Sequence, residues 1–286
     1  MAPTAGKLSG PVRFYLVAYN LVSFAGWLRI LLAVVVFIAQ GKQSFRPLPA
    51  AVDSVLQYVR PVVAAIAPPA FSDVPEPFGT ILRRAAMVHD QVGSIVLVFQ
   101  SLAVLEILHA VIGWVPANPL VVAVQVFSRV SVLFAVAEAY PAAARSPYYA
   151  LMVFAWSFSE VARYPFYVNQ LLNTQSYMAL WNRYTWFLVL YPLGVLGEIK
   201  LILASLPAQW PWVNADAWTP RDWFFLALLP LYIPGLFMLY SRLLAQRTKV
   251  LGSDFVGSKG REETRRRQNE YNAKISRPLA GSSKTE

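Results

Sequence analysis

One apolar run decides the fold class, and it reads Thr185-Trp-Phe-Leu-Val-Leu-Tyr-Pro-Leu-Gly-Val-Leu-Gly-Glu-Ile-Lys-Leu-Ile-Leu-Ala-Ser-Leu206. A helix needs about 20 predominantly apolar residues to cross the hydrocarbon core of a bilayer. This run is long enough, and only Glu198 and Lys200 within it carry charge. Five more apolar runs lie at residues 14–39, 93–115, 120–140, 148–172 and 223–245. The sequence therefore predicts an all-α polytopic membrane protein, a six-transmembrane-helix bundle formed by residues 1–250.

The overall composition is typical of a membrane protein and excludes several kinds of catalytic and metal-binding site. Of the 286 residues, 57% are hydrophobic and 14% are charged, whereas a soluble domain carries about 25% charged residues. The chain has no cysteine, which excludes disulfides, thiolate metal sites and thiol nucleophiles. Its two histidines, His89 and His109, are too few for the multi-histidine iron sites of membrane desaturases and hydroxylases. Carboxylates, tyrosines, arginines and hydroxyl groups remain for catalysis.

Two of the segments outside the six runs have a distinctive composition. Residues 41–84 contain seven prolines, and the apolar part at 52–66 includes Asp53, Arg60 and Pro61. We therefore expect an interfacial or loop insertion there and not a seventh span. Residues 251–286 are predicted to be a basic, disordered cytoplasmic tail. We interpret it mainly as a solvated tail that fixes the orientation of the protein, and the anionic leaflet is a better candidate partner for it than nucleic acid. Six spans put both termini on one side, which the Lys/Arg-rich tail indicates is cytoplasmic.

Charged side chains inside the apolar runs point to a polar interior. Each costs at least about 2.5–3.5 kcal/mol in the hydrocarbon zone, so such residues usually pair or serve a function. Glu160 and Arg163 lie three residues apart and can pair on one helix. Glu106, Arg129 and Arg183 lack such a local partner, so we expect partners from other helices. The full set is Arg29, Glu106, Arg129, Glu138, Glu160, Arg163, Glu198 and Lys200, with Arg183 near the end of a run.

Tyr191 and Glu198 are candidate proton-transfer groups. Seven residues of helix rotate through about 700°, so the two side chains share one face, roughly 10 Å apart along the axis. Pro192 can kink the helix between them. Gly194 and Gly197 are expected to leave space in which a substrate chain can pass. The spacing alone also fits a tyrosine at the membrane interface together with a glutamate that reaches toward water near the end of a span.

The sequence resembles the very-long-chain (3R)-3-hydroxyacyl-CoA dehydratases, also called protein tyrosine phosphatase-like proteins. Matching pieces occur in family order in nearly every run, and Tyr191 and Glu198 fall on the family's catalytic Tyr-Pro-x-Gly-x-x-x-Glu motif. Glu106, Arg129, Arg163, Arg183 and Gly194 fall on characteristic family positions, and Glu160 lies within a matching piece. The pieces are Tyr19-Asn20, Gly26-Trp27, Leu105-Glu-Ile-Leu-His109, Gln125-Val-Phe-Ser-Arg129, Trp156-Ser-Phe-Ser-Glu-Val-Ala-Arg-Tyr-Pro-Phe-Tyr167, Arg183-Tyr184, Leu190-Tyr-Pro-Leu-Gly-Val-Leu-Gly-Glu198, Tyr232-Ile-Pro-Gly235 and Ala245-Gln-Arg247.

The resemblance implies a hydro-lyase that needs no cofactor. It implies dehydration of a 3-hydroxyacyl-CoA to a trans-2-enoyl-CoA, the third step of fatty acid elongation, in the endoplasmic reticulum membrane. Implied partners are the acyl-CoA substrate, membrane lipids and the other elongation-cycle enzymes: elongase, ketoacyl reductase and enoyl reductase. Either Glu198 is the base and Tyr191 the acid, or the reverse. A non-enzymatic membrane scaffold or a lipid transporter is the competing hypothesis, since intramembrane charges fit a transporter too.

The sequence departs from the family in three places. The insertion at 41–84 and the tail are longer than in compact members, and the end of the chain, Ser282-Ser-Lys-Thr-Glu286, lacks a dilysine retrieval pair. A phosphatase activity finds no support, because a chain without cysteine has no thiolate nucleophile.

Overall fold

The computed structural model describes residues 8–42, 71–174 and 176–275. Within these ranges the chain is helical and has no β-strand. The elements in chain order are α1 (Gly10–Gln40), α3 (Phe78–Ala86), α4 (Val88–Leu102), α5 (Val104–Val111), α6 (Pro119–Val132), the π-helical turn η3 (Leu133–Ala137), α7 (Pro141–Ala144), α8 (Pro147–Leu171), α9 (Tyr177–Thr185), α10 (Phe187–Ser205), the 3₁₀ turn η4 (Ala215–Ala217), α11 (Pro220–Leu251) and α12 (Ser258–Ile275).

Local sequence explains where several of these helices begin. Helices α6, α8 and α11 start with proline, whose missing N–H is not needed in the first turn. The preceding residue caps each of them: the side chains of Asn118, Ser146 and Thr219 accept hydrogen bonds from backbone N–H groups of the first turn. In α11, the carboxylate of Asp222 also accepts a hydrogen bond from the backbone N–H of Thr219 at 2.9 Å, which completes a capping box.

The membrane protein predicted from the sequence is confirmed, but the number of spans is not. Five helical stretches of the described chain are long and apolar enough to cross a membrane: Gly10–Gln40, Val88–Val111, Pro119–Ala137, Phe187–Ser205 and Pro220–Leu251. The predicted run that is absent from these five, residues 148–172, corresponds to α8. This helix has the length of a span but contains Glu160 and Arg163. Helix α8 packs against α1, α3, α4, α9 and α10, so much of its surface meets protein.

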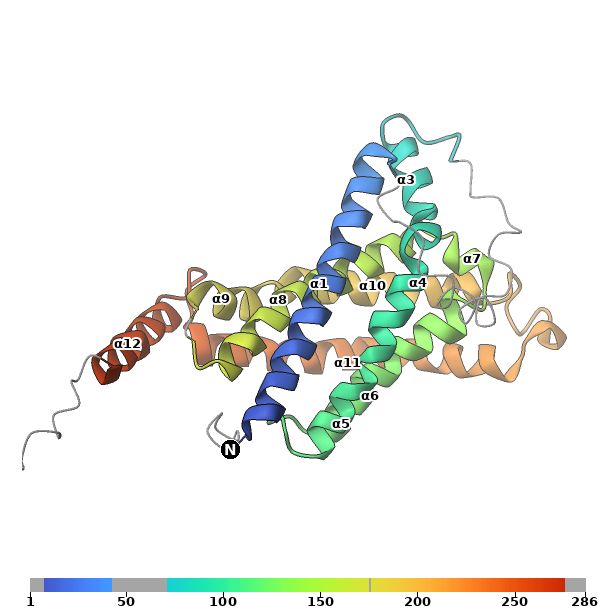
Figure 1. Cartoon of the computed structure of the whole chain (residues 1–286). Coiled ribbons are helices and arrows are strands. Elements are labelled where there is room, and N and C mark those ends of the chain that lie inside the picture. The colour runs from blue at the N-terminus through green and yellow to red at the C-terminus, as the bar shows by residue number, and fades with distance from the viewer. Residues whose placement is uncertain (1–7, 43–70, 175, 276–286) are drawn as a thin grey trace, which may run out of the picture.

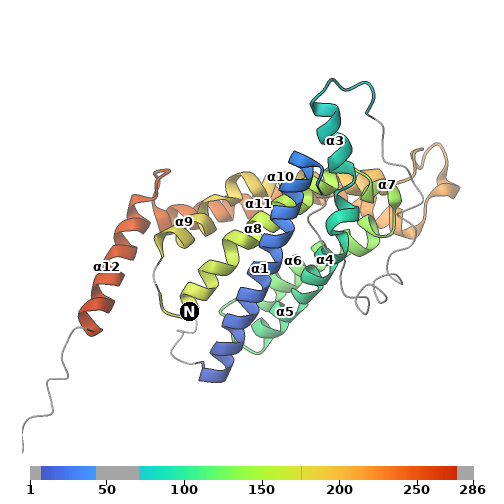
Figure 2. The same cartoon turned by 45° about the horizontal axis from the view of Figure 1, so that its top comes forward.

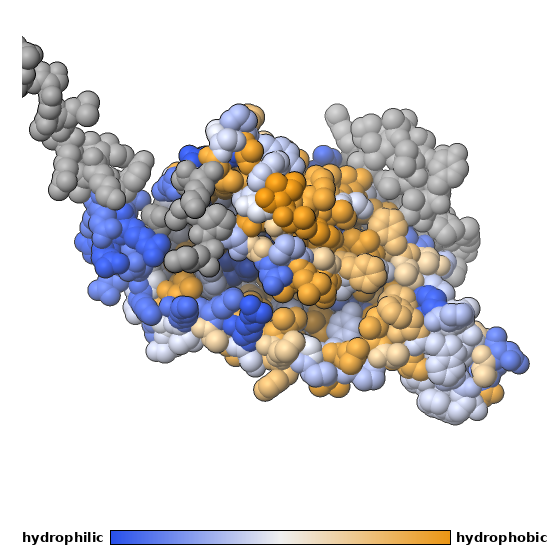
Figure 3. Space-filling model, turned by 90° about the horizontal axis from the view of Figure 1, so that it is seen from below, coloured by the Kyte–Doolittle hydropathy of each residue, from blue (hydrophilic) through white to orange (hydrophobic). Residues whose placement is uncertain are grey.

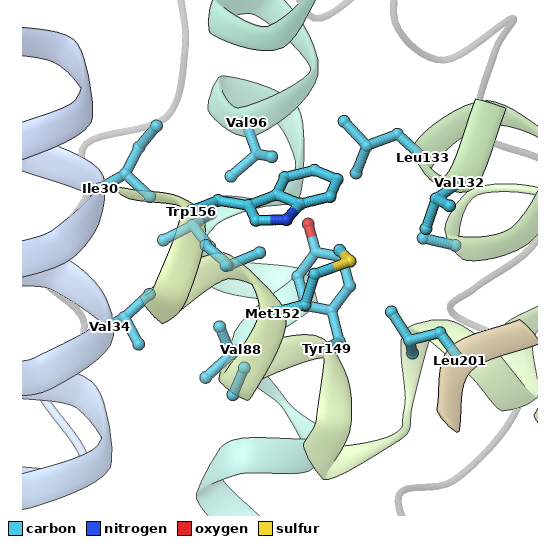
Figure 4. Close-up of a cluster of buried hydrophobic side chains, with 14 of the residues drawn as sticks. Ile30, Val34, Val88, Val96, Val132, Leu133, Tyr149, Met152, Trp156 and Leu201 are labelled. Atoms are coloured by element: carbon cyan, nitrogen blue, oxygen red, sulfur yellow. The ribbon is translucent and has the colours of Figure 1, made fainter. Parts of the chain in front are cut away.

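Helix α8 supplies the centre of the hydrophobic core. Its Tyr149, Met152 and Trp156 are at most 3% exposed. Figure 4 shows these side chains between Ile30 and Val34 of α1 on one side and Leu133 of η3 and Leu201 of α10 on the other. In Figure 1, α10 and α11 run side by side across the molecule, and α1 crosses α8. Figure 2 shows α8 lying along a similar line to α1, with the two helices running in opposite directions.

The surface carries the apolar side chains expected of a protein in lipid. Several lie on α11, and the four most exposed of them, Leu231, Ile233, Phe237 and Met238, are 60–76% exposed. Figure 3 shows apolar surface over the middle of the molecule and hydrophilic surface at the end that carries α12. Soluble monomers rarely leave large contiguous apolar patches open to water. The bilayer therefore covers this part of the surface.

Two expectations about the segments outside the spans can be compared with the structure. The apolar stretch at 52–66 lies outside the described residues, and the later part of the insertion contains α3. The tail differs from the expectation of disorder, because Ser258–Ile275 form α12. The start of the tail also folds back, since Arg247 donates to the carbonyl oxygens of Asp254 (3.2 Å) and Phe255 (2.8 Å).

Candidate active site

Small residues on α10 let it approach α8 closely. A Cβ atom at Gly197 would lie 2.8 Å from Met152 Cβ and 3.0 Å from Met152 Cα. One at Gly194 would lie 3.7 Å from Ala155 Cβ and from an indole carbon of Trp156. The expectation that both glycines leave space for a substrate chain is therefore wrong for Gly197, whose missing side chain makes room for α8. Gly194 faces the ring of Trp156.

Glu198 points into the protein and contacts two other helices. Trp156 Nε1 of α8 donates to Glu198 Oε1 at 3.0 Å, and the Tyr232 hydroxyl of α11 donates to Glu198 Oε2 at 3.1 Å. Each oxygen of the carboxylate thus has its own donor from a neighbouring helix. This geometry contradicts the alternative in which Glu198 reaches toward water from the end of a span.

Tyr191 lies two turns before Glu198 on the side of α10 that meets α11. Its ring stacks on Tyr240 of α11, with the centroids 6.4 Å apart and the planes 21° from parallel. Tyr240 in turn donates to the carbonyl oxygen of Leu188 at 3.2 Å. Since Tyr191 meets Tyr240 and Glu198 meets Tyr232, α10 and α11 run antiparallel. The prediction that Tyr191 and Glu198 share one face is confirmed, and that face is turned toward α11.

A network of ion pairs connects α5, α6 and α8. Arg163 of α8 donates twice to Glu106 of α5, at 3.0 and 2.7 Å. Arg163 also lies 2.6 Å from Glu160 of the same helix, and Arg129 of α6 lies 2.5 Å from Glu160. The Tyr164 hydroxyl donates to Glu106 at 2.9 Å. Both the predicted pair within α8 and the predicted partners of Glu106 and Arg129 on other helices are confirmed.

Trp156 links this network to Glu198. The Arg129 guanidinium carbon lies 5.1 Å from the centroid of the Trp156 ring, within the range of a cation–π contact. The same indole donates to Glu198. The ion pairs and the candidate catalytic carboxylate therefore meet at one aromatic ring.

Arg183 lies close enough to interact electrostatically with Glu160 of this network, but it forms no direct ion pair with it. Its guanidinium carbon lies 5.9 Å from the centroid of the Tyr184 ring. Among the described residues, no carboxylate lies within 4.0 Å of it, so the expected ion pair with another helix is wrong for this residue. Two more of the intramembrane charges have separate partners: Glu138 lies 2.8 Å from His89, and Lys200 lies 5.7 Å from the ring centroid of Tyr148.

The sequence analysis did not assign Trp156 or Tyr232 to the site. Both occur in the stretches that match the family, but neither side chain is charged at neutral pH, and a charge within an apolar run is the more obvious signal in the sequence. A polar hydrogen on an aromatic ring within an apolar helix is the signal that finds them, because a buried indole N–H or phenol hydroxyl needs a hydrogen-bond partner. In this protein the shared partner is Glu198.

A cavity of about 1070 Å³ lies elsewhere in the molecule. It is bounded by α1, α3 and the first half of α8, with Ile38, Ile81 and Leu151 among its lining residues. Neither Tyr191 nor Glu198 lines it. The site around Glu198 is thus defined by its contacts with α8 and α11 and not by this cavity.

Comparison with known proteins places the chain in a family. The family described as "Protein tyrosine phosphatase-like protein, PTPLA" matches residues 100–253, which include Tyr191 and Glu198. The chain is 32% identical to very-long-chain (3R)-3-hydroxyacyl-CoA dehydratase 2 of Mus musculus, over 86% of this chain and 84% of that protein. It is 30% identical to the very-long-chain (3R)-3-hydroxyacyl-CoA dehydratase hpo-8 of Caenorhabditis elegans, over 88% and 99%.

A third relative is the probable very-long-chain (3R)-3-hydroxyacyl-CoA dehydratase of Schizosaccharomyces pombe. It is 35% identical over 59% of this chain and 80% of its own length. No solved structure matches the chain. The resemblance drawn from the sequence motifs is therefore confirmed, and the chain belongs to the protein tyrosine phosphatase-like protein family.

Proposed function

We propose that this protein dehydrates very-long-chain (3R)-3-hydroxyacyl-CoA to trans-2-enoyl-CoA, the third step of fatty acid elongation. The observation that carries the proposal is the similarity to dehydratases over most of the chain, in a family match that includes Tyr191 and Glu198. The site fits this chemistry, because dehydration needs one group that removes a proton from C2 and another that protonates the leaving hydroxyl on C3. Tyr191 and Glu198 are assigned these two roles.

The hydrogen bonds of Glu198 favour it as the base. An indole N–H can only donate, so Glu198 Oε1 accepts from Trp156 whatever the protonation state of the carboxyl group. When the carboxylate is ionised, the Tyr232 hydroxyl donates to the other oxygen. Two donors stabilise the charged form, which is the form that can take a proton. Tyr191, whose hydroxyl has no hydrogen-bond partner among the described residues, is then the acid.

The reaction balances with these two groups alone. Glu198 takes the C2 proton, and the electron pair of that C–H bond forms the double bond between C2 and C3. The C3–O bond breaks, and the hydroxyl leaves as water with the proton of Tyr191. The proton on Glu198 then returns to the Tyr191 phenolate through the released water, which restores both groups. Arg129 and Arg163 hold the surrounding carboxylates and are assigned a positioning role, since their nitrogens bond Glu160 and Glu106.

The test uses purified protein in detergent and a long-chain 3-hydroxyacyl-CoA, with loss of water followed by mass spectrometry. Tyr191→Phe and Glu198→Gln each remove one proton-transfer group and keep the shape of the side chain. Each is expected to reduce turnover by about 10²- to 10⁴-fold, the contribution of a general acid or base. Near-wild-type turnover by both folded variants would contradict the proposal and favour a scaffold or transporter.

The cellular setting forms part of the same proposal. We place the protein in the endoplasmic reticulum membrane with both termini in the cytoplasm, which the basic C-terminal segment supports. Elongase, ketoacyl reductase and enoyl reductase are the proposed partners. The ketoacyl reductase makes the substrate from the product of the elongase, and the enoyl reductase consumes the dehydrated product. Protease protection of terminal tags in sealed microsomes checks the orientation, and co-purification from solubilised microsomes checks the partners. Tags protected from added protease would contradict the orientation.

A further inference from the structure

The carboxylate of Glu198 is held at both oxygens by donors from two different helices. The Trp156 indole of α8 lies 3.0 Å from Oε1, and the Tyr232 hydroxyl of α11 lies 3.1 Å from Oε2. Each carboxylate oxygen has two lone-pair directions, so each keeps one that can accept a proton. Rotation of the carboxylate would break both hydrogen bonds. The two donors thus fix the orientation of the carboxylate and leave one lone pair on each oxygen free to accept a proton.

Tyr232 is turned inward on a helix that is largely open to lipid. Its neighbours Leu231 and Ile233 are 60% and 74% exposed, whereas Tyr232 packs against the buried core. Pro230 and Pro234 flank it within α11. Each proline ring fixes its own φ and restricts the residue before it, which limits the backbone conformations that carry Tyr232. The sequence around position 232 therefore presents one hydroxyl to α10 in a restricted geometry.

We propose that Tyr232 is a positioning residue for the dehydration, which holds Glu198 in its ionised form and aims its free lone pairs at the substrate. The proposal rests on the proposed function, because it requires Glu198 to be the base. A neutral donor on a carboxylate stabilises the charged form more than the protonated form. Trp156 fixes the other oxygen, and Arg129 lies over the Trp156 ring and not on the carboxylate. Tyr232 therefore supplies a donor that the arginine network does not replace.

Tyr232→Phe tests the role, since it removes the hydroxyl and keeps the ring. We expect kcat to fall about 10- to 100-fold, the effect of losing one hydrogen bond to a charged group, with KM within about twofold of wild type. The acid limb of the pH dependence of kcat should move to higher pH, because the ionised base has lost a donor. Tyr148→Phe is the matched control, because the Tyr148 hydroxyl does not bond Glu198, whose donors are Trp156 and Tyr232, and the ring that faces Lys200 is kept. This variant should keep the wild-type kcat and pH profile.

The outcomes separate this proposal from the proposed function. If Glu198→Gln abolishes turnover but Tyr232→Phe keeps the wild-type kcat and pH profile, the positioning role is overturned and the dehydratase stands. A lower kcat at every pH with an unmoved acid limb also overturns it, because a loosened bundle would produce that result. Sustained turnover in Glu198→Gln would instead overturn the proposed function. Thermal unfolding in detergent verifies that each variant is folded, and an unfolded Tyr232→Phe would show that the hydroxyl is needed for the fold and overturn a role limited to catalysis.

Discussion

The guanidinium of Arg129 lies over the ring of Trp156, 5.1 Å from its centroid, while one of its nitrogens lies 2.5 Å from a carboxylate oxygen of Glu160. Arg129 thus forms an ion pair with Glu160 and also covers the indole of Trp156, which donates a hydrogen bond to Glu198. The planar guanidinium is suited to both contacts at once, because it stacks on aromatic faces and donates at its edges.

Arg129→Lys should separate charge from shape at this position. Lysine keeps the positive charge near Glu160 but loses the flat face that covers Trp156. We expect a folded protein whose kcat is about 10-fold lower, and Arg129→Gln should reduce both the folded yield and kcat. Steady-state kinetics with a long-chain substrate, alongside gel filtration in detergent, measure the two effects. A lysine variant with wild-type kcat would show that the stacked arrangement does not influence Glu198.

Arg163→Ala should destabilise the bundle as well as lower activity. Removal of Arg163 leaves Glu106 without its two strongest donors and leaves Glu160 with Arg129 alone. Breaking a buried ion pair at one partner costs about 3–5 kcal/mol. Thermal unfolding in detergent should therefore show a clearly lower midpoint and a reduced folded yield. An unchanged midpoint with weaker substrate binding would indicate instead that Arg163 contacts substrate.

Arg266→Ala provides the matched control for Arg163→Ala. Arg266 on α12 pairs with Glu263, but the two side chains are 67% and 40% exposed. Exposed pairs contribute about 0–1 kcal/mol. The unfolding midpoint of Arg266→Ala should stay close to that of the wild type, which shows that the effect at Arg163 comes from burial and not from loss of an arginine as such.

Gly197→Ala should loosen the contact between α8 and α10. The added Cβ would lie 2.8 Å from Met152 Cβ and 3.0 Å from two Met152 backbone atoms, so the helices must move apart. Overpacking of this kind costs about 1–3 kcal/mol. Gly235→Ala is the control, because nothing lies within 4 Å of its added Cβ and α11 gains a better helix former. A rise or no change in the unfolding midpoint of Gly197→Ala would contradict the close approach.

Glu138→Ala should lower stability without a direct effect on catalysis. Glu138 and His89 are almost fully buried and their side chains lie 2.8 Å apart, at residues that do not contact Glu198. Loss of the carboxylate leaves the His89 nitrogen without this partner. The free energy of unfolding should fall by about 3–5 kcal/mol if the two side chains form an ion pair. It should fall by about 1–3 kcal/mol if they form a neutral hydrogen bond. Glu138→Gln keeps a hydrogen-bond acceptor and discriminates between these cases by thermal unfolding. A lower kcat per folded molecule in either variant would contradict the separation from the site.

The helical membrane fold could be predicted because apolar run length is a local property of the sequence. The status of α8 could not be settled in this way, since Glu160 and Arg163 lower its hydropathy and their partners lie on α5 and α6. Helix α12 was missed because its composition is strongly polar, and composition does not distinguish a solvated helix from a disordered chain.

The candidate site shows the same division between local and distant information. Helical periodicity was sufficient to place Tyr191 and Glu198 on one face. It could not show that this face meets α11, because the register of two antiparallel helices depends on packing between residues about 40 positions apart. The same limit explains two errors of the sequence-based prediction. Gly197 was expected to leave space for a substrate chain but contacts α8, and Tyr232 was not predicted to contact Glu198.

The ion pairs of α8 also bear on how the protein is made. Glu106 and Arg129, which neutralise Arg163 and Glu160, come earlier in the chain than α8. During synthesis both are therefore already available when α8 leaves the ribosome. A helix that carries Glu160 and Arg163 can then enter the bilayer alongside partners that were inserted before it, so the order of the helices in the chain favours the insertion of α8.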